Sequence, residues 1–407
     1  MQYLTQEKAL SLFFDPTIPP QRATFTRMDE VEKSLEGLKL LANENNWKGV
    51  VHLTLILSET YKDDLEISLQ IKLIQIIGLI KLELYSRAQD SLQKLGNLNS
   101  KQYFYETYPA KFPNRKGSFV PFTLRVLQAE FPYFQGDYDK ALENLYTLHS
   151  NCIQEIGEIK KKIEDFGGKY PETITEINSP NSLYDQNFMI QNNFETKSNY
   201  SIEDIIELTI NTVGNVDDLE TAKESLSLLE KRSSMILFKI INIHIFQNDF
   251  ELALNHLNNL YLKFPSDHFL SSTIGRIYLK LGDIESAKKA FEFVEKITGA
   301  TSIFSKSNSG LVQIALGNYR QARDIFQEIY DNDPNNISAL NNLALMHFYT
   351  CNLEKAIFTL ETFIRKDPVQ NLQKVIVNNL SGLYDLGCDN SEEKKKVLSL
   401  VYDSYKL

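Results

Sequence analysis

Apolar positions recur along this 407-residue chain with the spacing of amphipathic helices, and one short pattern returns every 34 or 35 residues in its C-terminal half. Each copy has a polar turn, an aromatic or aliphatic residue, and an alanine three positions further on. A large apolar residue follows four positions after the alanine, and a proline or glycine follows after twelve. The alanines are Ala253, Ala287, Ala322 and Ala356, the large residues are Leu257, Phe291, Phe326 and Leu360, and the terminators are Pro265, Gly299, Pro334 and Pro368.

This pattern predicts one pair of antiparallel helices in each unit. The alanine lies where the second helix crosses the first, and the large residue one turn later fills the space beside it. Gly275 and Gly310 come twelve positions before their alanines, with Ala344 at the matching place, and would be the small partners on the first helices. The pattern is similar to that of the tetratricopeptide repeat, and it predicts an all-α fold, an α-solenoid of stacked helix pairs.

Weaker copies of the pattern occur upstream. Ala141 and Ala88 occupy the alanine position in two of them, and the stretch around Trp47 and Val50 is a degenerate third. We therefore expect about seven helix pairs and one or two closing helices after Pro368. The expected organisation is an N-terminal segment (1–30), degenerate repeats (31–156), a flexible Asn-rich loop (157–200) and C-terminal repeats with their closing helices (201–407).

Two stretches interrupt the period. Residues 103–122 contain three prolines, which exclude a continuous helix and predict an ordered, extended segment. Its rings either plug the gap between neighbouring repeats or, with its basic residues, form a docking surface for another subunit. The docking candidates are Tyr108, Phe112, Arg115, Lys116, Phe119 and Phe122. The second stretch, 157–200, has no sustained period and many Asn, Ser and Thr residues, which predicts a disordered loop. Helical pattern resumes at SIEDIIELTI, from Ser201.

Composition narrows the possible functions. The formal net charge of -10 argues against general nucleic-acid binding, which requires basic patches. The three cysteines are widely spaced, without a CxxC pair, so we expect neither a disulfide framework nor a zinc site. The N-terminus lacks the pattern of a signal peptide, and Lys72 and Lys81 interrupt the most apolar helix. These features predict a cytoplasmic protein that does not insert into a membrane.

No catalytic constellation is evident. None of the six histidines has a His or Cys partner at metal-ligand spacing, and we expect His244 and His347 to pack in the core. The FGGKY stretch does not match the pattern of a phosphate-binding loop, because Ile163 replaces the first glycine and Tyr170 replaces the Ser or Thr. We therefore expect no enzyme activity, no cofactor, no metal and no small-molecule substrate.

A concave groove is the second candidate binding region. Some tetratricopeptide domains hold acidic C-terminal tails with Lys and Asn from successive first helices, but the corresponding positions here lack the basic pairing. The mixed polar and apolar positions favour a helical or folded partner over a charged peptide. The predicted lining comprises Phe238, Asn242, Phe246, Arg276, Asn341, Phe348 and Tyr349.

The segment YFYETYPAKFPNRKGSFVPFTLRVLQAE resembles the stretch preceding a repeat helix in the family of subunit 12 of the trafficking protein particle (TRAPP) complex. The resemblance continues through SSTIGRIYLKLGDIESAKKAF, DPNNISALNNLAL and DPVQNLQKVIVNNLSGLYDL, and covers the chain roughly from Asn43 to its end. It implies a non-catalytic scaffold subunit of TRAPP III, which tethers vesicles and activates a Rab GTPase. The implied partners are the large outer subunits, and the implied location is peripheral to the ER–Golgi intermediate compartment and Golgi.

The resemblance further implies roles in ER-to-Golgi transport and autophagy, with nucleotide exchange belonging to the small core subunits. Some family members have a long polar N-terminal extension, whereas only about forty residues precede the repeats in this sequence. The alternative is a free tetratricopeptide adaptor or co-chaperone that binds peptides in its groove.

Overall fold

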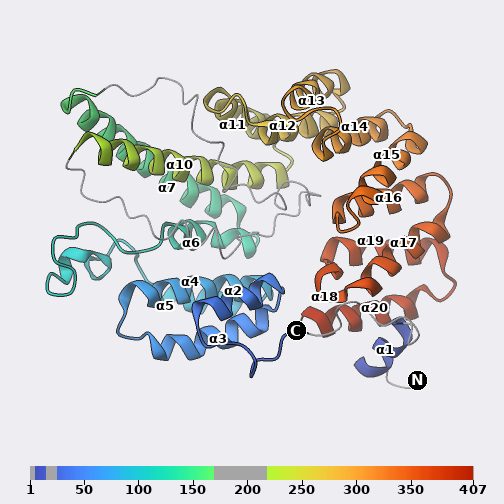
Figure 1. Ribbon diagram of the computed structural model, residues 1–407, viewed down its shortest axis with the longest axis horizontal. Helices are drawn as coiled ribbons and strands as arrows, with labels where there is room; N and C mark the ends of the chain where they lie inside the picture. The colour runs from blue at the N-terminus through green and yellow to red at the C-terminus, as the bar shows by residue number, and fades with distance from the viewer. Residues whose placement is uncertain (1–4, 15–24, 169–217, 407) are drawn as a thin grey trace.

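The computed structural model describes residues 5–14, 25–168 and 218–406 of the chain, and this part is all-helical without a named strand (Figure 1). Seven antiparallel helix pairs follow one another in the described residues, as the sequence predicted. The N-terminal pairs are α2 (Leu35–Asn43) with α3 (Trp47–Thr60), α4 (Leu65–Lys81) with α5 (Tyr85–Leu95), and α6 (Phe122–Phe134) with α7 (Tyr138–Asp165). The C-terminal pairs are α10 (Leu219–Phe246) with α11 (Phe250–Lys263), α12 (His268–Leu281) with α13 (Ile284–Thr298), α14 (Ile303–Ala315) with α15 (Tyr319–Asn332), and α16 (Ile337–Tyr349) with α17 (Leu353–Lys366). The remaining helices are α1 (Gln6–Phe13), α18 (Pro368–Asn371), α19 (Lys374–Gly387) and α20 (Ser391–Lys406).

Small residues lie at the helix crossings of the regular repeats. The four periodic alanines are completely buried. A Cβ atom added to Gly275 would lie 2.4 Å from Cε1 of Phe291, and one added to Gly310 would lie 2.7 Å from Cζ of Phe326. Each phenyl ring therefore occupies the space that the glycine of its own helix pair leaves empty, which confirms the predicted packing of small against large residues.

Polar residues in the turns cap the second helix of several pairs. The carboxylates of Asp249 and Asp283 accept the backbone N–H of Leu252 and Ser286, at 3.5 and 3.0 Å. Such N-caps satisfy backbone donors that have no partner within the helix. Each second helix of the regular repeats ends one or two residues before its terminator, and Pro368 also begins the short helix α18.

One predicted boundary is wrong. Helix α7 continues through Gly157 to Asp165, because Ile156, Ile159 and Ile163 keep helical spacing and are buried with residues of α10 in one core cluster. The first residues of the segment expected to be a loop are therefore helical. Residues 169–217, which hold the rest of that segment and the helical pattern from Ser201, lie outside the described residues.

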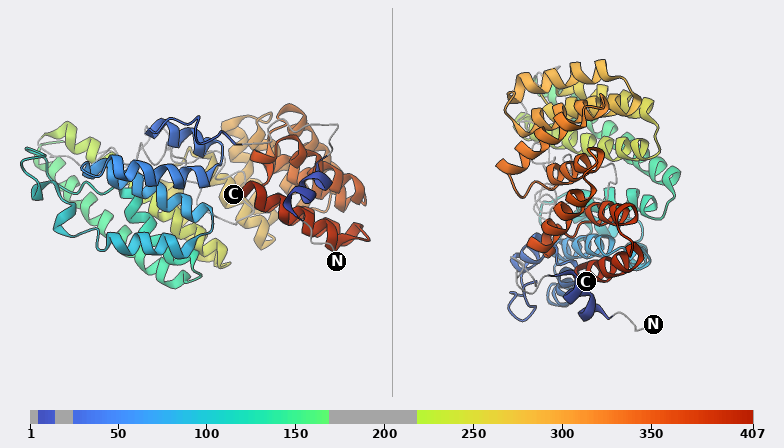
Figure 2. Two further views of the ribbon diagram at one scale, coloured as in Figure 1. Left: turned by 90° about the horizontal axis from the view of Figure 1, so that it is seen from below. Right: turned by 90° about the vertical axis from the view of Figure 1, so that its right-hand side faces the viewer.

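The solenoid curves until its two ends meet (Figures 1 and 2). Helix α1 packs on α20, and Nε of Arg365 donates to the carbonyl of Phe13 at 2.8 Å. Nearby, Nδ2 of Asn45, in the turn after α2, donates to Oε1 of Gln370 at 2.9 Å. The repeats at the beginning of the described chain thus contact the closing helices at its end.

Candidate protein-binding surfaces

The proline-rich segment between α5 and α6 folds back on itself. Two single 3₁₀ turns, Lys101–Tyr103 and Tyr105–Thr107, flank a β-bridge between Phe104 and Ser118. The backbone N–H of Phe119 donates to the carbonyl of Tyr103 at 3.1 Å. The segment is therefore an ordered excursion, as predicted, fixed by backbone hydrogen bonds between its two arms.

Phe119 is the centre of a cluster of aromatic rings in this segment. Its ring centroid lies between 5.5 and 6.4 Å from those of four other rings, and its own side chain is 6% exposed. Edge-to-face and tilted pairs at these distances add stabilisation beyond the buried area. The four rings are those of Tyr103, Tyr105, Tyr108 and Phe112.

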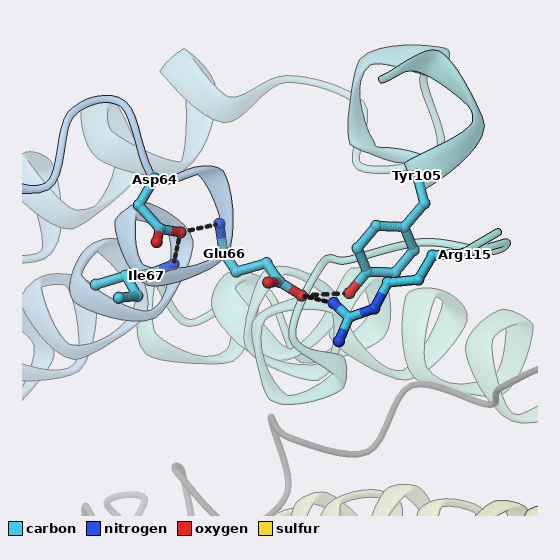
Figure 3. Close-up of polar contacts among 5 residues, drawn as sticks. All are labelled: Asp64, Glu66, Ile67, Tyr105 and Arg115. Atoms are coloured by element: carbon cyan, nitrogen blue, oxygen red, sulfur yellow. Dashed lines mark hydrogen bonds and ion pairs between the residues drawn. The ribbon is translucent and has the colours of Figure 1, made fainter. Parts of the chain in front are cut away.

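The cluster is anchored to the first turn of α4 (Figure 3). Oε1 of Glu66 accepts the hydroxyl of Tyr105, and it accepts Nη1 of Arg115 at 3.1 Å. Asp64 caps the same turn by accepting the backbone N–H groups of Glu66 and Ile67, both at 3.1 Å. The guanidinium of Arg115 also lies 5.3 Å from the centre of the Tyr105 ring, within range of a cation–π contact.

These contacts correct the predicted docking surface. Phe119 belongs to the core of the N-terminal repeats, and Phe122 is buried on α6 beneath the guanidinium of Arg232. Both rings are therefore removed from the set of surface candidates. Their burial could not be read from the sequence because the segment has no period. The candidates that retain exposed surface are Tyr108, Phe112, Arg115 and Lys116, of which the first two are half-buried.

The groove is formed on the concave side by the ends of successive first helices and by α19. It has a volume of about 710 Å³. Phe246, Arg276 and Asn341 line it, which agrees with three of the seven predicted positions. The floor is apolar, with contributions from Ile245, Leu279, Leu311, Ile314 and Val375.

The other four predicted positions do not line this groove. Phe238 is buried in the core that α10 shares with α7. Asn242 is half-buried and outside the lining, and Phe348 packs against the core of the closing helices. Tyr349 stacks on Tyr319 at a centroid distance of 4.8 Å. The repeat register predicted these residues on the concave face. Packing of the long helix α10 on α7 buries Phe238 instead, and Tyr349 stacks on a neighbouring ring.

Six amide side chains line the groove, and of these only Asn341 was predicted from the sequence. They come from the turn after α10, from α16, and from the start and middle of α19. Nδ2 of Asn379 donates to Oδ1 of Asn341 at 2.7 Å, so the two helices present a coupled amide pair. The repeated NN dipeptides at 341–342 and 378–379 were a usable signal, although α19 lies beyond the last regular repeat. The amide residues in the lining are Asn248, Asn341, Asn342, Gln373, Asn378 and Asn379.

The electrostatic character of the groove is positive. Arg276 and Lys280 are in its lining, which includes no aspartate or glutamate from the described part of the chain. Burial lowers the pKa of Arg276 to about 10 and also lowers the pKa of Lys280. At neutral pH the arginine remains protonated, so the groove carries positive charge above an apolar floor.

The histidines have structural roles. Nε2 of His244 and Nε2 of His256 lie 3.0 and 2.9 Å from Oη of Tyr146, and this arrangement joins α7, α10 and α11. Burial lowers the pKa of both histidines. His347 is also buried, and burial lowers its pKa to about 4. The predicted core positions of His244 and His347 are confirmed.

The part of the chain that the structure describes holds neither a metal-binding cluster nor a membrane-spanning helix. No group of three or more His, Cys, Asp or Glu residues among them is placed to hold a metal ion. Within the same residues, every helix is too short or too polar to cross a membrane.

Comparison with known proteins places the chain among helical-repeat proteins. Two family models, each described as "Tetratricopeptide repeat", match residues 272–297 and 308–336. A solved tetratricopeptide repeat protein from Parabacteroides merdae is 14% identical, covering 69% of this chain and 98% of that one, with a TM-score of 0.32. The hetero-tetramer Cut9–Hcn1 of APC/C contains a chain that is 12% identical, with coverage of 92% and 69% and a TM-score of 0.34. These two likenesses are too weak to add to the fold argument, which rests on the helix pairs themselves.

Two curated proteins are much more similar in sequence. "Trafficking protein particle complex subunit 12" of Homo sapiens is 27% identical over 391 residues, covering 91% of this chain and 46% of that protein. The Mus musculus protein of the same name is 27% identical over 384 residues, with coverage of 90% and 42%. The chain spans about half the length of the curated relatives it matches. The resemblance drawn from the sequence is confirmed: two stretches of the chain match the tetratricopeptide repeat, and over nine tenths of its length the chain is similar to subunit 12 of the trafficking protein particle complex.

Proposed function

We propose that this protein is a non-catalytic scaffold subunit of a TRAPP III-type assembly, which tethers vesicles and activates a Rab GTPase. The observation that supports this function is the similarity to subunit 12 across nine tenths of the chain, combined with a repeat solenoid. Solenoids bind other proteins through extended surfaces, since each repeat contacts mainly its neighbours and leaves two faces for partners. On this proposal the protein acts in ER-to-Golgi transport and autophagy, in the cytoplasm at early secretory membranes.

The proposed contact with the large outer subunits is the exposed edge of the segment at residues 108–116. Arg115 keeps 57% of its side chain exposed despite its ion pair with Glu66, and Lys116 is exposed. Arginine and tyrosine are enriched among residues that contribute strongly to binding, and Tyr108 lies half-buried beside them. The buried rings beneath this edge would hold it rigid before a partner arrives, which reduces the entropy lost on binding.

The experiment is affinity purification of the tagged chain from cells, with quantitative mass spectrometry of the recovered proteins. We expect the wild-type chain to recover TRAPP subunits and the double variant Arg115→Gln with Lys116→Glu to recover several-fold less. The matched control is Lys161→Gln with Lys162→Glu, which makes the same charge change at exposed positions of α7. Recovery without any TRAPP subunit would contradict the function, whereas equal recovery by both variants would contradict only the docking surface.

A free adaptor is the second candidate, and the groove is the observation that favours it. A groove of about 710 Å³, with both apolar and polar lining residues, has the size of a ligand site. The two functions predict different hydrodynamic sizes for the native protein in cell extract. Gel filtration of cell extract should place the chain with TRAPP subunits in fractions of high mass if it is a scaffold subunit, and at its monomer position if it is a free adaptor.

A further inference from the structure

Helix α1 lies against α20 at the C-terminal end of the solenoid, apart from α2 and the other N-terminal repeats (Figures 1 and 2). Residues 15–24 join it to the rest of the chain. Its side chains Ala9 and Phe13 are at most 5% exposed and belong to the core cluster of the closing helices. They are four positions apart, so both project from one face of α1 into that cluster. The face of α17 and α20 under α1 is therefore a helix-binding site, which α1 occupies.

A polar anchor in this site is built by the closing repeats alone. Nη2 of Arg365 lies 2.9 Å from Oε2 of Glu361. Oε1 of Glu361 accepts the hydroxyl of Tyr384 at 2.7 Å. The first two residues are one turn apart on α17, and Tyr384 is on α19. Because these contacts do not involve α1, they position the guanidinium before a helix binds, which reduces the entropy lost on binding.

The anchor recognises the C-terminal end of a helix. Nε of Arg365 donates to the carbonyl oxygen of Phe13 at 2.8 Å, and its guanidinium lies 5.1 Å from the centre of the Phe13 ring. The last carbonyl groups of a helix lack partners within it and carry partial negative charge, so a cation stabilises them. The Phe14 ring also packs edge-to-face on Tyr405 at 6.1 Å. The site therefore selects a helix that ends in aromatic residues, with a small residue such as Ala9 one turn earlier.

The present occupant is a weak helix by itself. α1 has eight residues, and isolated helices shorter than about 12–15 residues are marginal in water. Its packing is on α20, so its release leaves the helix pairs of the solenoid in contact with one another. A longer helix with the same pattern could make every contact that α1 makes. Such a helix would also lose less conformational entropy on binding, because more of it is helical when free.

We propose that this site binds an amphipathic helix of a partner protein, and that α1 blocks the site in the free chain. The partner helix has a small residue at the place of Ala9, an aromatic residue at the place of Phe13, and its last carbonyl groups at Arg365. Because residues 15–24 keep α1 covalently close, α1 competes at a local concentration on the order of millimolar. Only a helix that binds more strongly than α1 replaces it. The inference does not rest on membership of a TRAPP assembly.

The first test measures binding of a synthetic peptide of residues 1–14, fluorescently labelled and amidated at its C-terminus, to the purified full chain. Phe13→Ala in the chain removes the ring that holds α1, so this variant should bind the peptide at least tenfold more tightly than wild type. Leu12→Ala is the matched control, because Leu12 is on the same helix but 55% exposed, and it should bind like wild type. Fluorescence anisotropy measures each affinity, and equal affinities for wild type and Phe13→Ala would overturn the proposal.

Substitutions in the peptide test the pattern without changing the chain. Peptides with Phe13→Ala or Ala9→Leu should lose binding, the first through the missing ring and the second because the buried position holds only a small residue. A peptide with Leu12→Ala should bind like the parent peptide. Equal binding by all four peptides would contradict the recognition of a small and an aromatic residue one turn apart.

The anchor is tested in the Phe13→Ala chain, where α1 no longer competes. Adding Arg365→Met keeps an unbranched apolar side chain but removes the donor, and it should weaken peptide binding about tenfold because a charge-assisted hydrogen bond is lost. Adding Lys366→Met removes the neighbouring exposed charge on α17 and should leave binding unchanged. Circular dichroism confirms that both variants are folded. Equal binding by the two would contradict the site.

Displacement of α1 is tested on the wild-type chain. The probe is the same peptide with a hydrocarbon staple between positions 7 and 11, which are both exposed in α1 and whose linkage keeps the peptide helical. At saturation, amide hydrogen exchange should become faster within α1 and stay unchanged from α12 to α15. Unchanged exchange in α1 with the peptide bound would place the peptide elsewhere and overturn the proposal.

Sedimentation velocity tests the other possible occupant. A wild-type dimer that is absent from Phe13→Ala would assign the site to α1 of a second copy of the chain, which would overturn the choice of a different protein. A wild-type monomer supports that choice. Because the purified chain is used alone, these results are independent of the affinity purification that tests the proposed function.

Discussion

The regular repeats from α10 to α17 and the segment at residues 101–122 fill the space between helices in different ways. In the repeats from α12 to α15, a glycine on one helix faces a phenyl ring on the next, and the same pairing returns after 35 residues. In the segment, by contrast, the ring of Phe119 packs on four other rings. The repeats thus depend on close helix approach, and the segment depends on a single cluster.

This difference predicts how the stability of each region responds to mutation. A solenoid repeat shares its stability with its neighbours, so a local defect is distributed over adjacent interfaces. The segment has one cluster of rings with a single centre, so removing the central ring weakens all four ring contacts at once. Mutations in the two regions should therefore differ in size and in how far their effects reach.

The largest effect is expected from Phe119→Ala. Removing a buried phenyl ring costs about 3–5 kcal/mol of unfolding free energy, because apolar contacts are lost and a cavity remains. Amide hydrogen exchange should show loss of protection at Phe119 itself and in α6, with little change from α12 to α17. Urea unfolding followed by circular dichroism measures the free energy.

Phe112→Ala is the matched control for that prediction, since Phe112 belongs to the same ring cluster but is only half-buried. It should cost clearly less than Phe119→Ala. Equal costs would show that Phe119 is not the centre of the cluster, and loss of protection throughout the repeats would show that the segment is not an independent unit.

A buried ion pair connects the regular repeats to α6, the helix that follows the segment, and breaking it should have a similarly large effect. Nζ of Lys239 on α10 lies 3.2 Å from Oε2 of Glu130 on α6, and both residues are less than a tenth exposed. Lys239→Met leaves a buried carboxylate without this cation and should cost about 3–5 kcal/mol. Combining it with Glu130→Leu should recover most of that loss. A double variant as unstable as the single one would contradict the account of the pair.

The regular repeats should show a smaller cost for a single added methyl group. Gly275→Ala places a Cβ 2.4 Å from Phe291, and the ring must move, at a cost of about 1–3 kcal/mol. Gly382→Ala is the control, because a Cβ there meets no atom within 4 Å in helix α19. It should instead raise stability by about 0.5–1 kcal/mol through helix propensity. Thermal unfolding of the two variants side by side should give shifts of opposite sign.

The same contrast explains which parts of the structure were predictable from the sequence. Ala287 and Gly275 could be assigned to a helix crossing because their type and spacing recur, and recurrence separates a packing requirement from chance. Phe119 and Phe122 could not be assigned, since a ring between prolines is equally consistent with a buried plug and an exposed contact. Only the path of the backbone, fixed by the bridge between Phe104 and Ser118, decides between them.

The groove was predictable in part for the same reason. Arg276 and Asn341 follow from the repeat register, and both line the groove. Asn378 and Asn379 lie in α19, beyond the last regular repeat, where the register no longer applies. Phe238 was misplaced because α10 is 28 residues long and packs along α7, so that its concave positions are covered.

Weakening the closure of the solenoid should have the smallest effect on stability. The closure is also the hardest feature to predict from the sequence, because it joins residues about 290 positions apart. Nζ of Lys374, at the start of α19, lies 3.4 Å from Oε1 of Glu83, just after α4. Both side chains are partly exposed, so their coupling should be about 0.2–1 kcal/mol and should fall as salt rises.

Glu83→Lys and Lys374→Glu should each destabilise the chain slightly, and the charge-reversed pair should restore the attraction. A double-mutant cycle in low salt measures this coupling, and a coupling of zero would contradict the predicted contribution of this ion pair to the closure. A measurable coupling would show that the regular repeats and the N-terminal repeats, with their different ways of packing, form one closed unit.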